Sequence, residues 1–328
     1  MKIDSSSLYR DIIKRAFLVT WRNRFLWILG FFTTFLGLGS LYEITVKNSI
    51  NNIEIFSSFA NKITSISLSG IIISKNLDKI NIGNAILTIF FLIFATALIA
   101  FLIWLAVISF SGLIKSAQKL DQNKKKLSLR VVLKEGKQHF WQILGINILG
   151  KVLITCLLAF TGWTLSFIII DHSIGRAFFY FFVALLFIAI SLLITFLIVY
   201  ASCFSILKEK SFFSSIKHSW DLFKKNWIVS IEASVILFAV NFILKLTLTA
   251  SIVLLSIPFM ILLLLFYSAA STISGISTVI IAIWILISIV LMVLVGSFYS
   301  AFQIVAWTFI FDRINKGGVL SKLHRIFG

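Results

Sequence analysis

Long runs without any charged residue dominate the chain, at residues 25–42, 80–114, 152–170, 177–207 and 246–311. A helix that spans a membrane needs about 20 mainly apolar residues. The first four runs are therefore expected to hold one span each, and the last run is long enough for two spans with a turn between them. The pattern predicts an all-α, polytopic membrane protein with six transmembrane helices.

A second pattern precedes the first, third and fifth spans. In each of these segments apolar residues recur every three or four positions, while Lys residues fall mainly on the other side, which predicts an amphipathic helix. The apolar positions are Tyr9, Ile13, Phe17 and Trp21, then Leu129, Leu133, Gly136 and Phe140, then Phe212, Ile216, Trp220, Phe223 and Trp227. A helix of this kind lies in the membrane interface, and a helix that docks another protein is the alternative. The expected interfacial anchors are Trp21, Trp141, Trp220 and Trp227.

These segments divide a single membrane domain, residues 1–328, into three hairpin repeats. Each repeat is expected to contain a cytoplasmic interfacial helix, a span, an outside turn and a second span. The repeats cover residues 1–114, with a long outside loop at 47–84, then 115–207 and 208–312, followed by a basic tail at 313–328. Two copies share a local string, because Lys14-Arg-Ala-Phe…Asn23 resembles Lys217-His-Ser-Trp…Asn226.

Composition and charge place these repeats in a membrane. Hydrophobic residues make up 59% of the chain and charged residues 13%, with a mean hydropathy of +1.04, whereas about a quarter of the residues in soluble domains are charged. The net charge of +18 would suit nucleic acid, but 23 of the 30 Lys and Arg residues lie in the alternate segments that include both termini. The positive-inside rule then predicts a multi-pass protein of the cell membrane with both termini cytoplasmic. Anionic membrane lipids are the expected partners, and nucleic acid is not.

Polar residues inside the apolar helices are the candidates for function. Residues spaced four apart give each of two spans one amide, one ammonium and one hydroxyl on a single face: Asn147, Lys151 and Thr155 in the third span, and Asn241, Lys245 and Thr249 in the fifth. Two such faces turned toward each other would form a cationic slot for a phosphate, a carboxylate or a lipid head group. Alternatively, the two lysines snorkel at the cytoplasmic boundary, because a full span follows each of them.

The usual components of catalysis do not come together in the sequence. The histidines are scattered over different loops, and Cys156 and Cys203 both lie inside apolar runs. Metal-protease, nucleotide-binding and paired-carboxylate motifs are missing. We therefore expect no catalytic residues, no metal and no cofactor. Gly296, Ser297, Ser300 and Ala301 have the spacing of a helix-packing surface, and Gln303 is expected to hydrogen-bond across helices.

Two strings carry a resemblance to known proteins. The string KKNW at residues 224–227 enters a span, and FQIVAWTFIFDRI at residues 302–314 leaves the last one. With six spans, they resemble a broad group of prokaryotic integral membrane proteins named after the membrane domain found beside some glycerophosphodiester phosphodiesterases. The resemblance implies a six-helix membrane domain over nearly the whole chain. It implies no phosphodiesterase activity, because the catalytic barrel would need a few hundred soluble residues.

The sequence thus predicts an integral membrane protein without enzymatic activity that binds or transports an anionic or amphipathic, lipid-like solute. The alternative is a structural or accessory subunit of a larger membrane complex, with protein partners or further copies of the chain packed against it.

Overall fold

A computed structural model describes residues 8–34, 82–122, 129–170, 174–269 and 274–316. Within these ranges the chain is all-helical and contains no strand. The helices are α1 (Leu8–Arg22), α2 (Phe25–Thr34), α6 (Ile82–Asp121), α7 (Leu129–Gln138), α8 (Phe140–Ile170), α9 (Ile174–Leu207), α10 (Phe212–Lys225), α11 (Trp227–Ala269) and α12 (Ser274–Asn315).

Five of the helices are long and apolar enough to cross a membrane. By length and composition, the candidate spans are Ile89–Asp121, Phe140–Trp163, Phe178–Leu207, Trp227–Leu264 and Val279–Asn315. The chain is therefore built as a multi-pass membrane protein. For the first predicted span, the structure describes the apolar helix α2, and residues 35–42 of that run lie outside the described residues. Most of the predicted outside loop at 47–84 and most of the tail at 313–328 also lie outside them.

The buried core lies at one end of every long helix. It contains residues 106–117 of α6, 196–206 of α9 and 298–314 of α12, together with the first turns of α8 and α11. The short helices α1, α2, α7 and α10 pack against these same ends. We call this region the hub. It gathers the ends of the long helices that the charge pattern assigns to the cytoplasm.

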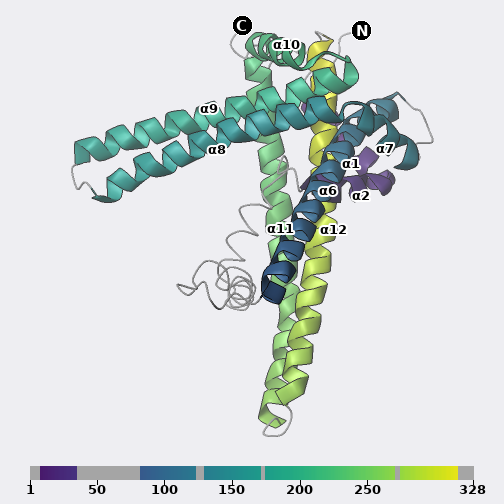
Figure 1. Ribbon diagram of the computed structural model, residues 1–328, viewed down its shortest axis with the longest axis vertical. Coiled ribbons are helices and arrows are strands. Elements are labelled where there is room, and N and C mark those ends of the chain that lie inside the picture. The colour runs from purple at the N-terminus through teal and green to yellow at the C-terminus, as the bar shows by residue number, and fades with distance from the viewer. Residues whose placement is uncertain (1–7, 35–81, 123–128, 171–173, 270–273, 317–328) are drawn as a thin grey trace.

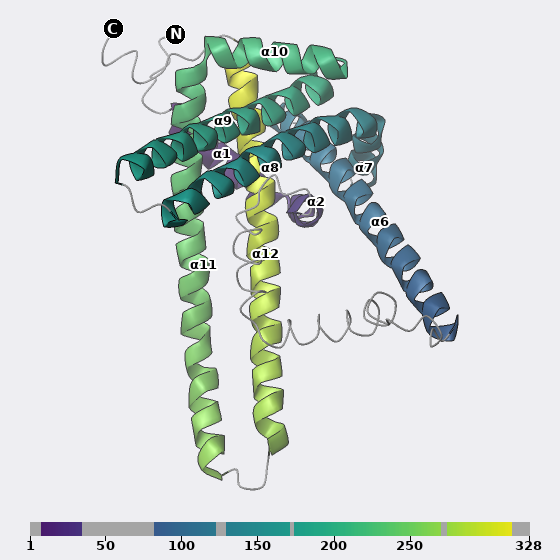
Figure 2. The same cartoon turned by 60° about the vertical axis from the view of Figure 1, so that its left-hand side comes forward.

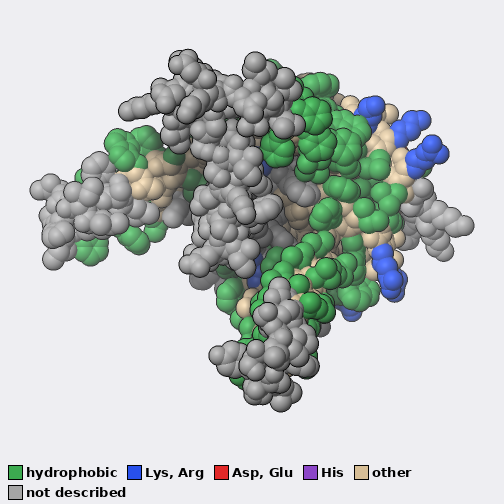
Figure 3. All heavy atoms as spheres, turned by 60° about the horizontal axis from the view of Figure 1, so that its bottom comes forward, with side chains coloured by type: hydrophobic (Ala, Val, Ile, Leu, Met, Phe, Trp, Pro, Cys, Tyr) green, Lys and Arg blue, Asp and Glu red, His purple; other side chains and the backbone are tan. Residues whose placement is uncertain are grey.

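Beyond the hub the long helices diverge. The pairs α8–α9 and α11–α12 form two hairpins that cross at a steep angle in both Figure 1 and Figure 2, and α6 leaves the hub in a third direction. The most apolar 18 residues of α11 include none that is buried, and those of α12 are 6% buried. Seen from the outer ends of α11 and α12, hydrophobic side chains cover most of the described surface in Figure 3, with Lys and Arg toward one edge. The outer halves therefore expose apolar surface suited to lipid or to other membrane helices.

Small residues permit the closest helix contacts in the hub. A Cβ added at Gly30 of α2 would lie 2.1 Å from the Ser297 carbonyl oxygen and 3.0 Å from Ala301 Cβ. One turn along, the hydroxyls of Thr33 and Ser300 lie 2.7 Å apart in a hydrogen bond. The predicted small-residue surface of the last helix is thus a real contact, and its partner is α2. Close backbone approach is what small residues provide between membrane helices.

The three predicted linker helices are present as α1, α7 and α10, but their buried strips differ from the predicted apolar stripes. In α1 the residues facing the hub are Ile12, Ala16 and Thr20, and in α10 they are Ser215 and Ser219. The large aromatic side chains lie to one side of these strips, because small residues let the helix approach its neighbour closely while rings would hold it away. In α10 only part of the predicted stripe, chiefly Phe212, Ile216 and Phe223, packs against the core.

Candidate functional site

The polar face predicted for the third span lies on α8. Asn147 is buried in the hub, where its Nδ2 donates to the Ile143 carbonyl oxygen at 2.8 Å. Its Oδ1 has no hydrogen-bond partner among the described residues. Lys151 and Thr155, one and two turns further out, are exposed. The face therefore begins inside the protein and continues onto an open apolar wall that also exposes Leu149, Val152 and other large side chains.

The matching face on α11 is only partly described. Lys245 is half-buried and Thr249 is exposed, while the Asn241 side chain lies outside the described set. The main packing partners of α8 are α9, α6 and α10, and those of α11 are α12 and α10. The structure thus places Lys151 and Lys245 on walls of two different hairpins and does not pack these walls against each other. The shared slot stays a prediction.

A small cavity lies between α6, α9 and α12. Its volume is about 20 Å³, and Phe110, Cys203, Gln303, Trp307 and Thr308 are among the residues that line it. A water molecule needs roughly 10–15 Å³ of such space. The buried Oε1 of Gln303 accepts no hydrogen bond among the described residues, so the expected bond across helices is not found for this atom. The cavity is large enough for about one water and far too small for a lipid-like solute.

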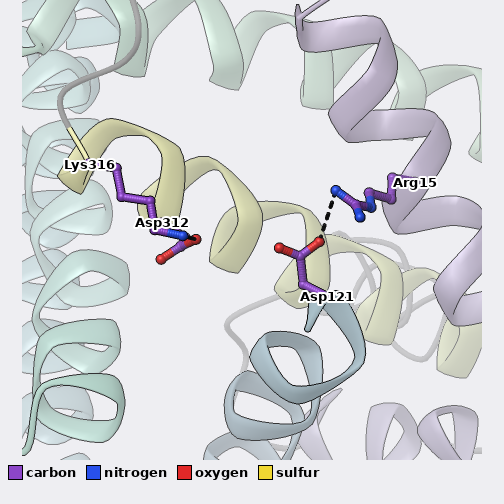
Figure 4. Close-up of polar contacts among 4 residues, drawn as sticks. All are labelled: Arg15, Asp121, Asp312 and Lys316. Atoms are coloured by element: carbon purple, nitrogen blue, oxygen red, sulfur yellow. Dashed lines mark hydrogen bonds and ion pairs between the residues drawn. The ribbon is translucent and has the colours of Figure 1, made fainter. Parts of the chain in front are cut away.

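Ion pairs fasten the linker helices to the hub. Arg15 of α1 lies 3.1 Å from Asp121 at the end of α6, as Figure 4 shows. Lys119 of α6 pairs with Glu135 of α7. The pairs are part-exposed, so each contributes little stability. Their arrangement still shows that α1, the end of α6 and α7 lie together at the hub.

His139 lies at the turn between α7 and α8. Burial lowers the pKa of its imidazole, and the nearby Lys115 ammonium lowers this pKa further. Both effects favour the neutral ring near pH 7. Its Nδ1 is buried without a hydrogen-bond partner among the described residues.

The four predicted anchors are all exposed. The exposed fraction is 56% for Trp21, 80% for Trp141, 38% for Trp220 and 52% for Trp227. The ammonium group of Lys224 lies over the Trp220 ring, 5.0 Å from its centroid. Exposed indole rings beside cations are typical of the membrane interface. The small residues that seat these helices on the hub were not identified from sequence, although their spacing of four in α10 is a usable signal.

The described part of the chain contains no group of three or more His, Cys, Asp or Glu residues placed to hold a metal ion. Both cysteines are free thiols, with Cys156 exposed and Cys203 buried. Comparison with known proteins gave no relative, because no family model, no curated protein and no solved structure matches the chain.

Proposed function

We propose that this protein is a non-enzymatic membrane protein that binds an anionic, lipid-like solute along the outer walls of its helices. The observation that carries the proposal is the contrast between the hub and these walls. The cavity described between α6, α9 and α12 has room for about one water, which is too little for a lipid-like solute. By comparison, Lys151 is exposed on the apolar wall of α8.

A cation on an apolar wall suits a ligand with both an acidic head and an acyl tail. The exposed side chains around Lys151 include Ile148, Leu149, Val152 and Leu153. The head would pair with the ammonium group and the tail would lie against the aliphatic surface, which favours the same class of solute that the sequence suggests. Lys245, half-buried on α11, offers a second such position.

Native mass spectrometry of the gently extracted protein, with identification of the retained lipids and metabolites, tests this proposal. We expect a defined anionic amphiphile on the wild type and its loss from the Lys151→Ala/Lys245→Ala double variant. A matched control changes two exposed lysines outside the spans, Lys208→Ala and Lys225→Ala, and should retain the solute. Equal retention by the double variant and the wild type would show that the two lysines only snorkel.

A second candidate is an accessory subunit of a membrane complex. It is favoured by the outer half of α11, which exposes Leu254 at 72% and Leu264 at 68%. Lipid tolerates larger side chains there, but a packed partner helix does not. Leu254→Trp/Leu264→Trp should therefore release a stoichiometric protein partner if the protein is a subunit. If the protein is not a subunit, the same variant should change nothing.

A further inference from the structure

The three linker helices agree in burial at three equivalent positions. Taking Lys14, Lys134 and Lys217 as equivalent, the residue two places later is small and buried in every helix, as Ala16, Gly136 and Ser219. The residue two places earlier is buried as well, as Ile12, Val132 and Ser215. The residue one place earlier is partly buried in all three, as Ile13, Leu133 and Ile216.

The polar ends of α1 and α10 match in the same register. Asn23 donates its Nδ2 to the Val19 carbonyl oxygen at 2.8 Å, and Asn226 donates its Nδ2 to the Leu222 carbonyl oxygen at 3.2 Å. Both asparagines follow their equivalent lysine by nine residues. Each caps the carbonyl end of its linker helix immediately before the next apolar helix. The two helices therefore enter their spans in the same way.

With the helices aligned in this way, each has three exposed residues at equivalent positions: the aligned lysine, the residue three places after it and the residue seven places after it. We call each set of three a triplet. The triplets are Lys14, Phe17 and Trp21, then Lys134, Lys137 and Trp141, then Lys217, Trp220 and Lys224. All nine side chains are exposed. Within the continuous helices α1 and α10, at about 100° per residue, positions spaced in this way fall within about 60° of one helix face. In the middle copy the two lysines belong to α7, and Trp141 follows in the first turn of α8.

Each triplet combines at least one cation with at least one aromatic ring and contains no acidic residue. The single acidic residue of each linker helix lies outside the triplet, as Asp11, Glu135 and Asp221. Glu135 instead pairs with Lys119 of α6. In α10 the cation and the ring of the triplet already meet, with Lys224 over Trp220. Two of these acidic side chains border a triplet, because the exposed Asp11 lies three residues before Lys14 and the exposed Asp221 lies four residues after Lys217. A phosphate beside such a face pairs with the lysine ammonium groups, while the ring rests against the acyl boundary.

We propose that the three triplets are equivalent binding positions for anionic phospholipid head groups of the membrane leaflet that the hub faces. Each position lies just before an apolar helix, so a lipid whose phosphate pairs with the lysine can lay its chains along the following span. The proposal rests on the membrane setting of the proposed function but not on its solute, because the triplets exclude Lys151 and Lys245.

The test counts phospholipids that stay bound to the full-length protein in native mass spectra, after reconstitution in phosphatidylcholine with a minor fraction of phosphatidylglycerol. The wild type should retain phosphatidylglycerol in excess over its share of the mixture. The variants Lys14→Gln, Lys134→Gln and Lys217→Gln, combined stepwise, should each lower the phosphatidylglycerol affinity about fivefold, the fold-change that corresponds to about 1 kcal/mol per surface cation. Phosphatidylcholine retention should not change.

Two neighbouring lysines of α10 provide a matched control. Lys224 belongs to a triplet and Lys225 does not, although both are exposed, and they lie about 100° apart around the helix. Lys224→Gln should reduce phosphatidylglycerol retention, and Lys225→Gln should not. Equal effects of the two variants would overturn the proposal in favour of unspecific charge, as would unchanged lipid retention together with loss of an acidic protein partner. The Lys151→Ala/Lys245→Ala variant should keep its triplet-bound phosphatidylglycerol, so the solute proposal and the triplet proposal can fail separately.

Discussion

The contact between α2 and α12 allows a sharp test of how the hub is packed. Gly30→Ala adds a Cβ that would lie 2.1 Å from the Ser297 carbonyl oxygen, where ordinary contact begins at 3.4 Å. The obstacle is backbone, so it cannot rotate away, and the two helices must separate by about 1.3 Å, the difference between these distances. The hydrogen bond between Thr33 and Ser300 would be strained by the same movement.

The expected cost follows from these contacts. Overpacking in a well-packed core costs typically about 1–3 kcal/mol, and a hydrogen bond between membrane helices contributes on average about 0.6 kcal/mol. Against this, alanine is a better helix former than glycine by up to about 1 kcal/mol. We expect Gly30→Ala to lower the free energy of unfolding by about 2 kcal/mol, which corresponds to a fall in Tm of several degrees for a protein of this size.

Gly162 supplies the matched control, because a Cβ added there meets nothing within 4 Å. Gly162→Ala should leave Tm unchanged or raise it slightly through helix propensity. Both variants are compared with the wild type by thermal unfolding in detergent, followed by tryptophan fluorescence. If Gly30→Ala is as stable as Gly162→Ala, then α2 does not pack on α12 as described.

Three further predictions concern other parts of the hub. Gly136→Val should detach α7 from α6, because even a Cβ there lies 2.4 Å from a backbone oxygen of α6; faster proteolysis around α7 would show this, and wild-type resistance would contradict it. Tyr200→Phe and Ser230→Ala each remove one side of a 2.8 Å hydrogen bond between α9 and α11; a double-mutant cycle on the free energy of unfolding should give a coupling of roughly 0.6–1.7 kcal/mol, and additive losses would mean that the bond is absent. Burial and Lys115 hold the pKa of His139 below its ordinary value of 6.5, so the unfolded chain binds its proton first as the pH falls and stability declines below about pH 6.5. His139→Gln should reduce the fall in Tm between pH 7.5 and 5, and an unchanged pH profile would refute this assignment.

The helices and their locations were largely predictable, because each apolar run is much longer than any turn and each linker carries a helical period. α10, for example, begins at Phe212 and ends at Lys225, inside the predicted segment. The small-residue contact at Ser297 and Ala301 was also predicted, since that spacing has few other uses in a membrane helix.

The side of each linker helix that faces the protein could not be derived from hydrophobicity. In a membrane setting, rings prefer the interface, and small residues such as Ala16 and Ser219 take the protein contact. A pattern based on hydrophobicity alone does not distinguish the side of the helix that faces the interface from the side that faces the protein. Whether Lys151 and Lys245 meet was not predictable either, because the spacing within each helix says nothing about how two hairpins are turned toward each other.

The proposed roles of the hub, of the triplets and of the apolar wall around Lys151 all depend on which side of the membrane each part of the chain lies. Reporter fusions at Lys125 and Lys322, which read out the cytoplasmic or external side in intact cells, test it most directly, with a third fusion at Ser271 between the last two spans. Six spans with both termini inside predict cytoplasmic signals at Lys125 and Lys322 and an external signal at Ser271. An external signal at either of the first two positions, or a cytoplasmic one at Ser271, would contradict the account.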